Sequence, residues 1–236
     1  MYNKINKINR LLNEAFGIPK RSKKLPDPVD LLIATILSQN TNDKNSYQAY
    51  SNLKKQYKSW EDVASQPLAK LEITIKSAGL AKQKSRTIKD FLASPKNKRE
   101  KIDLDYLIKL TNDEIIAELT STNGIGVKTA ACVLLFSLDR NICPVDTHVH
   151  RTLNRIGLVQ TKSPEKTFSI INKHLPEGIA HQFHTNLIRL GREICKPAKP
   201  KCAICPLLHI CKYDEKNLDP LSVQIKNDFM LLDEIH

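Results

Sequence analysis

The chain has 236 residues, of which 41% are hydrophobic, enough for the buried core of one large domain or two modest ones. Its 37 Lys+Arg against 25 Asp+Glu give a formal net charge of +12, which favours a polyanionic partner, above all nucleic acid; a merely lysine-rich surface is the alternative. No apolar run approaches the roughly 20 residues that span a bilayer. Residues 1–10 are polar and basic, unlike a signal peptide, so we expect a soluble intracellular, cytoplasmic protein.

Apolar residues recur mainly at helical spacing, and two-residue alternation is missing, which predicts an all-α protein. Pro26 and Pro28 separate a basic N-terminal segment from the apolar run at residues 31–37, for which we predict a helix start at Asp30. A second helix start is predicted at Thr111, where a glutamate three residues later completes a T-x-x-E capping box.

A glycine-rich turn follows, at Asn123-Gly124-Ile125-Gly126, between a helix predicted to end near Thr120 and one predicted to begin near Val127. Glycine tolerates positive φ and lets another backbone approach, while the next helix presents unpaired amides that can bind a phosphate. The pattern fits a helix-hairpin-helix clamp on a DNA backbone. Taken alone, such a glycine pair is more often plain turn chemistry.

Lys128 comes directly after this turn, on the first turn of a helix whose remainder, residues 130–138, is apolar. The positive helix end and the apolar surroundings disfavour the ammonium form, which favours a nucleophilic amine. Asp146 follows a break at residues 141–144 and is placed to cap the next helix. A solvated lysine and a purely capping aspartate are the alternatives without a catalytic role.

Near the C-terminal end, four cysteines follow the pattern C-x6-C-x2-C-x5-C: Cys195, Cys202, Cys205 and Cys211. Four thiolates fit either a tetrahedral zinc or a [4Fe–4S] cube, and spacing alone leaves both open; disulfides are the less favoured alternative. The loop also carries three lysines that would face a phosphate-rich partner: Lys196, Lys199 and Lys201.

Two further cysteines are interpreted as packed residues without a ligand role, since Cys132 lies in an apolar helix and Cys143 precedes a proline. After Tyr213 the chain becomes less basic, which predicts a C-terminal extension over residues 214–236.

Taken together, these motifs resemble the endonuclease III family, helix-hairpin-helix DNA glycosylases with an iron–sulfur cluster loop. The resemblance runs from about Pro28 to Tyr213, and its carriers are residues 30–38, Gly79-Leu80, residues 124–130, residues 145–148, Gly191-Arg192 and the cysteine spacing. It implies two helical lobes with a DNA cleft between them. Residues 28–140 would form a barrel-like lobe ending with the hairpin and the catalytic helix, and residues 1–27 with 141–213 the iron–sulfur cluster lobe.

The resemblance also implies a bifunctional DNA glycosylase/AP lyase of base excision repair, which removes oxidised pyrimidines from duplex DNA and cleaves 3′ to the abasic site by β-elimination. Lys128 matches the amine that attacks C1′ of the damaged nucleotide, and Asp146 matches the catalytic carboxylate. The cysteine spacing matches the family's [4Fe–4S] ligation, which favours this cluster over zinc. The expected partner is double-stranded DNA containing damaged bases or abasic sites, and a monomer suffices.

A flipped nucleotide leaves a hole in the duplex that side chains must fill. Asn40 stands where the family has its gap-filling glutamine, and Leu80 matches its apolar wedge. Because Asn40 is shorter by one methylene, neighbouring Gln39 is a second candidate. The family's Pro-Gly at the hairpin is Asn123-Gly124 here, and we expect Gly124 and Gly126 to keep the clamp on the DNA backbone.

Two other functions remain open at this point. A monofunctional mismatch glycosylase of the same superfamily would resemble a longer protein with a glutamate in place of Thr35, whereas Lys128 is the mark of the lyase branch. A noncatalytic DNA-binding protein would need neither Lys128 nor Asp146.

Overall fold

The structure is a computed structural model, and it describes residues 1–94 and 102–219. Every regular element in these residues is helical, which confirms the predicted all-α class. The described residues form two compact units: a terminal unit (residues 1–21 and 140–219) and a central unit (residues 22–94 and 102–139). Residues 220–236, most of the predicted C-terminal extension, lie outside the described residues.

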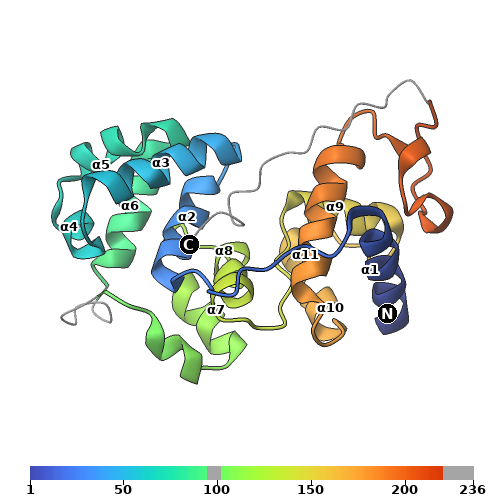
Figure 1. The fold of residues 1–236 in the computed structure, drawn as a ribbon, viewed down its shortest axis with the longest axis horizontal. Coiled ribbons are helices and arrows are strands. Elements are labelled where there is room, and N and C mark those ends of the chain that lie inside the picture. The colour runs from blue at the N-terminus through green and yellow to red at the C-terminus, as the bar shows by residue number, and fades with distance from the viewer. Residues whose placement is uncertain (95–101, 220–236) are drawn as a thin grey trace. The chain divides into compact units, whose positions relative to one another are not determined.

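In the central unit, α2 (Pro28–Ser38) is the core helix, and every residue from Val29 to Leu37 is buried. It packs against α3 (Asp43–Gln56), α6 (Ala81–Leu92) and α8 (Val127–Cys132), as Figure 1 shows. The other elements of this unit are α4 (Trp60–Ser65), α5 (Leu68–Thr74), η1 (Lys76–Ala78), η3 (Asp105–Lys109), α7 (Asn112–Thr120) and the π-helical turn η4 (Val133–Ser137).

The prediction that α2 starts at Asp30 is wrong. The helix begins at Pro28, and Asp27 is the N-cap, accepting hydrogen bonds from the amides of Val29 at 2.9 Å and Asp30 at 3.1 Å. Proline suits the first helical position because its missing N–H would have no partner there. The carboxylate of Asp30 is instead buried, where it accepts hydrogen bonds from Lys54 and Trp60.

The other predicted caps are confirmed. Thr111 and Glu114 form a complete capping box at the start of α7. Asp146 is the N-cap of α9 (Thr147–Ile156), where its Oδ1 accepts from the Val149 amide at 2.9 Å. Each cap satisfies an amide that the first helical turn leaves without a partner.

The terminal unit joins the start of the chain to its later helices. α1 (Tyr2–Phe16) buries Ile5, Ile8 and Leu12 and packs against α11 (Ala180–Arg189), beside which it lies in Figure 1. Hydrogen bonds from Asn186 to Asn13 and Gly17, and from Arg189 to Phe16, tie α11 to α1. The remaining elements are α10 (Pro164–Lys173), the π-helical turn η5 (Leu190–Ile194), η6 (Cys202–Ile204) and η7 (Leu208–Ile210).

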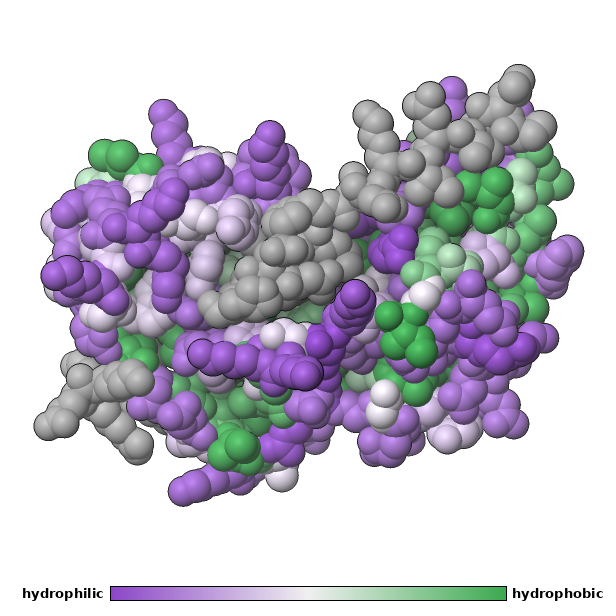
Figure 2. Space-filling model, viewed as in Figure 1, coloured by the Kyte–Doolittle hydropathy of each residue, from purple (hydrophilic) through white to green (hydrophobic). Residues whose placement is uncertain are grey.

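The surface is mainly hydrophilic, as expected for a chain in which 26% of the residues are charged. On the face drawn in Figure 2, hydrophilic side chains predominate over both units and hydrophobic ones form small separate areas. Among the described residues, no helix has the length and apolar character that crossing a membrane requires.

Candidate active site and thiolate loop

The turn between α7 and α8 depends on one of its two glycines. Gly124 has φ +91°, and a Cβ there would lie 2.2 Å from Oγ1 of Thr87 on α6. Gly126 has φ −95° and open space where a Cβ would project. Gly124 is therefore required for the close packing of the hairpin on α6, whereas Gly126 leaves the approach to the first amides of α8 open.

Gln39 braces the hairpin from the end of α2. Its side-chain amide donates to the Gly124 carbonyl at 3.2 Å and to Oγ1 of Thr129 at 3.3 Å. Asn40, the next residue, is exposed and has φ +51°. The structure thus places the two candidate gap-filling residues differently, because Gln39 is engaged with the protein and Asn40 faces solvent.

Leu80 is held out into solvent by a strained turn. It is 53% exposed and has φ +47°, directly after Gly79 at φ +68°. Positive φ is disfavoured for a leucine and persists only where the surrounding structure enforces it, a feature common at ligand-contacting sites.

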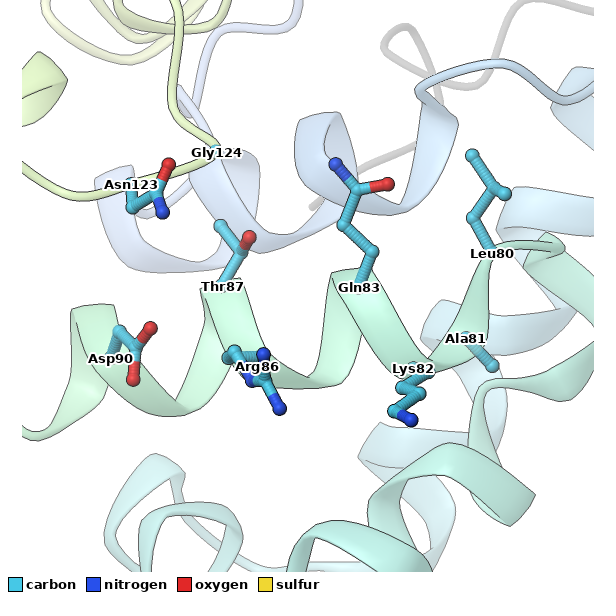
Figure 3. Close-up of a pocket in the computed structure, with 9 residues that line it drawn as sticks. All are labelled: Leu80, Ala81, Lys82, Gln83, Arg86, Thr87, Asp90, Asn123 and Gly124. Atoms are coloured by element: carbon cyan, nitrogen blue, oxygen red, sulfur yellow. The ribbon is translucent and has the colours of Figure 1, made fainter.

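A groove of about 470 Å³ runs along α6 from Leu80 to the hairpin at Asn123 and Gly124 (Figure 3). Its other lining residues are mostly polar or charged: Ala81, Lys82, Gln83, Arg86, Thr87 and Asp90. In Figure 3, the side chains of Leu80, Gln83 and Thr87 project from the same side of α6. The groove therefore connects the exposed leucine to the hairpin by a surface that carries both cations and an amide.

Lys128 is half-buried on the first turn of α8. The rest of that helix, from Thr129 to Cys132, is buried and continues into the buried turn η4. A side chain on such an element has a firmly held backbone behind it. Lys128 belongs to the central unit and Asp146 to the terminal unit.

Around Asp146, α9 is tied to the segment that leads into the first cysteine. Arg151 Nε donates to the Cys195 carbonyl at 3.0 Å, and Arg151 Nη2 donates to the Gly191 carbonyl at 2.8 Å. A Cβ on Gly191 would lie 2.8 Å from Cβ of His148, so the turn η5 packs closely on α9. Burial lowers the pKa of His148, although the nearby Asp146 carboxylate acts in the opposite direction. The guanidinium of Arg151 is therefore engaged in hydrogen bonds within the terminal unit.

The four predicted ligands all lie on one loop with free, half-buried thiols: Cys195, Cys202, Cys205 and Cys211. Burial, together with the charges of the other three sulfurs, raises the pKa of the Cys205 thiol to about 12. Cys132 and Cys143 are fully buried elsewhere, in agreement with their predicted packing role.

Arg155 on α9 contacts both ends of the cysteine loop, near Cys195 and near Cys211. Its Nη1 lies 3.7 Å from Cys195 Sγ and 2.7 Å from the Lys196 carbonyl, and its guanidinium stacks over the Tyr213 ring at 4.2 Å. Its own carbonyl oxygen lies 3.3 Å from Cys211 Sγ. A cation beside the sulfurs offsets the negative charge that thiolates bring to a metal centre.

Within the described residues, no three His, Cys, Asp or Glu side chains converge closely enough to hold a single metal ion. An iron–sulfur cube makes a different demand, because each cysteine binds a separate iron. Four neighbouring thiols with an adjacent guanidinium fit that group by their chemistry. Of the three loop lysines, Lys196 and Lys199 are exposed, whereas Lys201 is only 9% exposed and is not presented to a partner.

Comparison with known proteins identifies the family. The family model of the HhH-GPD superfamily base excision DNA repair protein matches residues 33–177. Endonuclease III of Thermotoga maritima is 34% identical over 209 residues, which cover 87% of this chain and 92% of that protein. The chain belongs to the endonuclease III family. A putative DNA glycosylase of Arabidopsis thaliana is 35% identical over 190 residues, 76% of this chain and 65% of that protein.

Solved structures agree with this assignment. A non-covalent endonuclease III–DNA complex superposes with a TM-score of 0.75 at 28% identity, covering 90% of this chain and 95% of that one. A trapped endonuclease III–DNA covalent intermediate gives a TM-score of 0.72 at 29% identity, covering 90% and 96%. The fold and family predicted from the sequence are confirmed.

Sequence reasoning missed the arginine contacts of this endonuclease III family member. Arg151 and Arg155 stand one helical turn apart on α9, and their partners Cys195 and Lys196 lie far along the chain. In the sequence, the only local feature of these contacts is the i, i+4 spacing of the two arginines after the predicted Asp146 cap. That spacing by itself predicts a solvent-exposed helix face.

Proposed function

We propose that this endonuclease III family protein is a bifunctional DNA glycosylase/AP lyase that removes oxidised pyrimidines from duplex DNA. The observation that carries the proposal is the half-buried Lys128 on the first turn of α8, directly behind the hairpin that Gly124 and Gln39 fix. DNA binding alone needs no amine at this position. The family membership supports the same reading.

In the proposed reaction, the neutral Lys128 amine attacks C1′ of the flipped nucleotide while the glycosidic C1′–N bond breaks. The departing base takes the bonding electron pair and a proton. The sugar ring then opens to an imine between Lys128 and C1′, with O4′ taking up a proton. The imine acidifies the C2′ proton, and its removal expels the 3′ phosphate, which cleaves the strand. Water finally hydrolyses the imine and returns the amine.

Asp146 is proposed as the carboxylate that stabilises positive charge developing at C1′ and relays the Lys128 proton. Its position is fixed because Oδ1 caps α9, while the second oxygen takes no part in that cap. In this proposal each unit supplies one of the two catalytic groups, Lys128 from the central unit and Asp146 from the terminal unit.

The chemistry requires a flipped nucleotide, because C1′ is not reachable inside a stacked duplex. We propose that Leu80 enters the stack and that Asn40, rather than Gln39, fills the vacated place. Their exposure and positive φ support this choice, as does the engagement of Gln39 with the hairpin. Backbone amides after Gly126 would bind phosphate, helped by Lys196 and Lys199.

A [4Fe–4S] cluster on Cys195, Cys202, Cys205 and Cys211 is part of the proposal. When bound, it would crosslink the loop, and Arg155 would offset its negative charge. Replacing Cys202 by serine is expected to lower both iron content and DNA affinity. A Cys202→Ser protein with unchanged iron and affinity would contradict this assignment.

The proposed activity is tested by incubating the iron-loaded protein with duplexes that carry thymine glycol or an abasic site and analysing both base release and strand ends. We expect free thymine glycol, a 5′ phosphate and a 3′ unsaturated aldehyde, and strong loss of all three in Asp146→Asn. Base release without strand cleavage would indicate a monofunctional glycosylase, and binding without either product a noncatalytic DNA-binding protein.

A further inference from the structure

Lys84 on α6 is a buried lysine that the proposed reaction does not use. It is 2% exposed, and its Nζ donates to the carbonyls of Leu37 at 2.7 Å and Ala78 at 2.8 Å. Its main-chain amide also donates to the Leu80 carbonyl at 3.0 Å. The described residues place no carboxylate within ion-pair distance of it. Burial lowers its pKa to about 8, and even the neutral amine keeps two N–H groups for its two carbonyl acceptors.

Both carbonyls stand at helix ends. Leu37 is the residue before the last of α2, and Ala78 is the last residue of η1, positions whose carbonyls lack partners within the helix. A lysine is well suited to such ends, because its N–H groups satisfy the carbonyls and its charge complements the helix dipole. The Lys84 side chain therefore links the C-terminal ends of α2 and η1 by hydrogen bonds.

Each fastened end leads directly into an exposed residue with positive φ. After Leu37 the chain passes through Ser38 and Gln39 to Asn40 at φ +51°. After Ala78 it passes through Gly79 to Leu80 at φ +47°. Positive φ is unfavourable for leucine, so the Leu80 turn depends on a firmly held helix end before it. Asparagine tolerates positive φ, but the direction of the Asn40 side chain still depends on where α2 ends.

We propose that Lys84 is a positioning residue that holds the Asn40 turn and the Leu80 turn in one fixed arrangement, so that both side chains enter damaged DNA together. The inference rests on the proposed function, in which these two residues fill the space left by the flipped nucleotide. In this inference Lys84 itself does not contact DNA and acts only through the Asn40 turn and the Leu80 turn.

The chain offers a matched control on the same helix. Lys89 is also a lysine whose Nζ donates to two backbone carbonyls, those of Ala64 and Gln66, at the end of α4. Lys89 is half-buried rather than buried, but it makes the same kind of hydrogen bonds as Lys84, and the helix end that it bonds does not lead to Asn40 or Leu80. Lys84→Met and Lys89→Met each remove the N–H donors and keep a long apolar side chain.

The experiment measures affinity for a duplex that carries a tetrahydrofuran abasic analogue opposite 2-aminopurine, whose fluorescence reports unstacking of the opposite base. This analogue has no cleavable C1′ chemistry, so the readout is independent of the lyase reaction. We expect Lys84→Met to lose about tenfold or more in affinity together with the fluorescence change, since small misplacements of a positioned group have effects of this size or larger. Lys89→Met should retain both, even if its thermal stability falls equally.

A double-mutant cycle separates positioning from general stability. If Lys84 acts by positioning Leu80, then adding Lys84→Met to a Leu80→Ala variant should change the fluorescence signal little further. Lys84→Gln, which keeps N–H donors but is too short to reach both carbonyls, provides the same comparison if Lys84→Met does not fold. Equal affinity and fluorescence in parent and Lys84 variants would overturn the inference. Loss of lyase activity in the parent, with the fluorescence difference intact, would count against the proposed function alone.

Discussion

Arg151 on α9 donates a hydrogen bond from Nε to the main-chain carbonyl of Cys195 at 3.0 Å. The same guanidinium bonds the Gly191 carbonyl at 2.8 Å, so the helix that Asp146 caps is held to the segment that enters the cysteine loop. The cluster loop and the proposed catalytic carboxylate therefore share one structural link within the terminal unit.

Replacing Arg151 by methionine should weaken this link. Hydrogen bonds to a charged donor contribute about 1.5–3 kcal/mol, so we expect a lower free energy of unfolding by about that amount and several-fold faster iron loss to a chelator. Denaturant titration and iron release measure the two effects. Arg10→Met, which removes an exposed i, i+4 ion pair on α1, serves as the control and should change stability by less than about 0.5 kcal/mol. Equal iron release from the two variants would show that Arg151 does not support the loop.

Alanine at the two hairpin glycines should give unequal results. Gly124→Ala places a Cβ against Thr87 at positive φ, so we expect destabilisation of about 1–3 kcal/mol and weaker DNA binding. Gly126→Ala meets open space and should lose no more than about 1 kcal/mol, from a poorer N-cap of α8. Thermal unfolding and duplex affinity distinguish the two. The prediction fails if the Gly126 variant is the more damaged.

Substitutions of Asn40 and Gln39, the two candidates for gap filling, should also have different effects on stability and on DNA affinity. Asn40→Gly keeps the positive φ and removes only an exposed side chain, so stability should stay within about 0.5 kcal/mol while affinity for an abasic duplex falls. Gln39→Ala removes two hydrogen bonds to the hairpin and should lower stability by about 1–2 kcal/mol. Finding the affinity loss without a stability change in Gln39→Ala instead would reverse the assignment.

The pH dependence of stability should carry a contribution from Lys84. Burial lowers its pKa from 10.5 to about 8, so between these values the unfolded chain binds more protons than the folded protein. The free energy of unfolding therefore gains a component that rises as pH increases from about 8 to 10.5. Subtracting the Lys84→Met profile from that of the parent isolates this component, because other groups cancel. A difference that stays flat over this window would contradict the buried, desolvated state of Lys84.

Local sequence signals predicted the parts of the fold that local chemistry determines. The capping box at Thr111, the Asp146 cap and the glycine turn before Lys128 each depend on neighbours within a few residues. The start of α2 was misplaced because Asp27 and Asp30 are both good caps, and only the buried contacts of Asp30 with Lys54 and Trp60 decide between them.

Contacts between distant segments were beyond the reach of sequence patterns. Nothing near Gln39 indicates that its amide bonds the Gly124 carbonyl, and nothing near Lys201 indicates that it is buried while Lys196 is exposed. Lys84 looks like one more cation in a basic helix until the ends of α2 and η1 are placed against it. In each case tertiary packing, rather than residue type, assigns the role.

Borohydride reduction during incubation with an abasic duplex tests the central claim most directly, because it converts an imine to a stable amine crosslink. We expect the iron-loaded parent to form a covalent adduct that peptide mapping assigns to Lys128, and we expect Lys128→Ala to form none while still binding the duplex. An adduct of undiminished yield in Lys128→Ala, or no adduct with a folded, iron-loaded parent, would contradict the account.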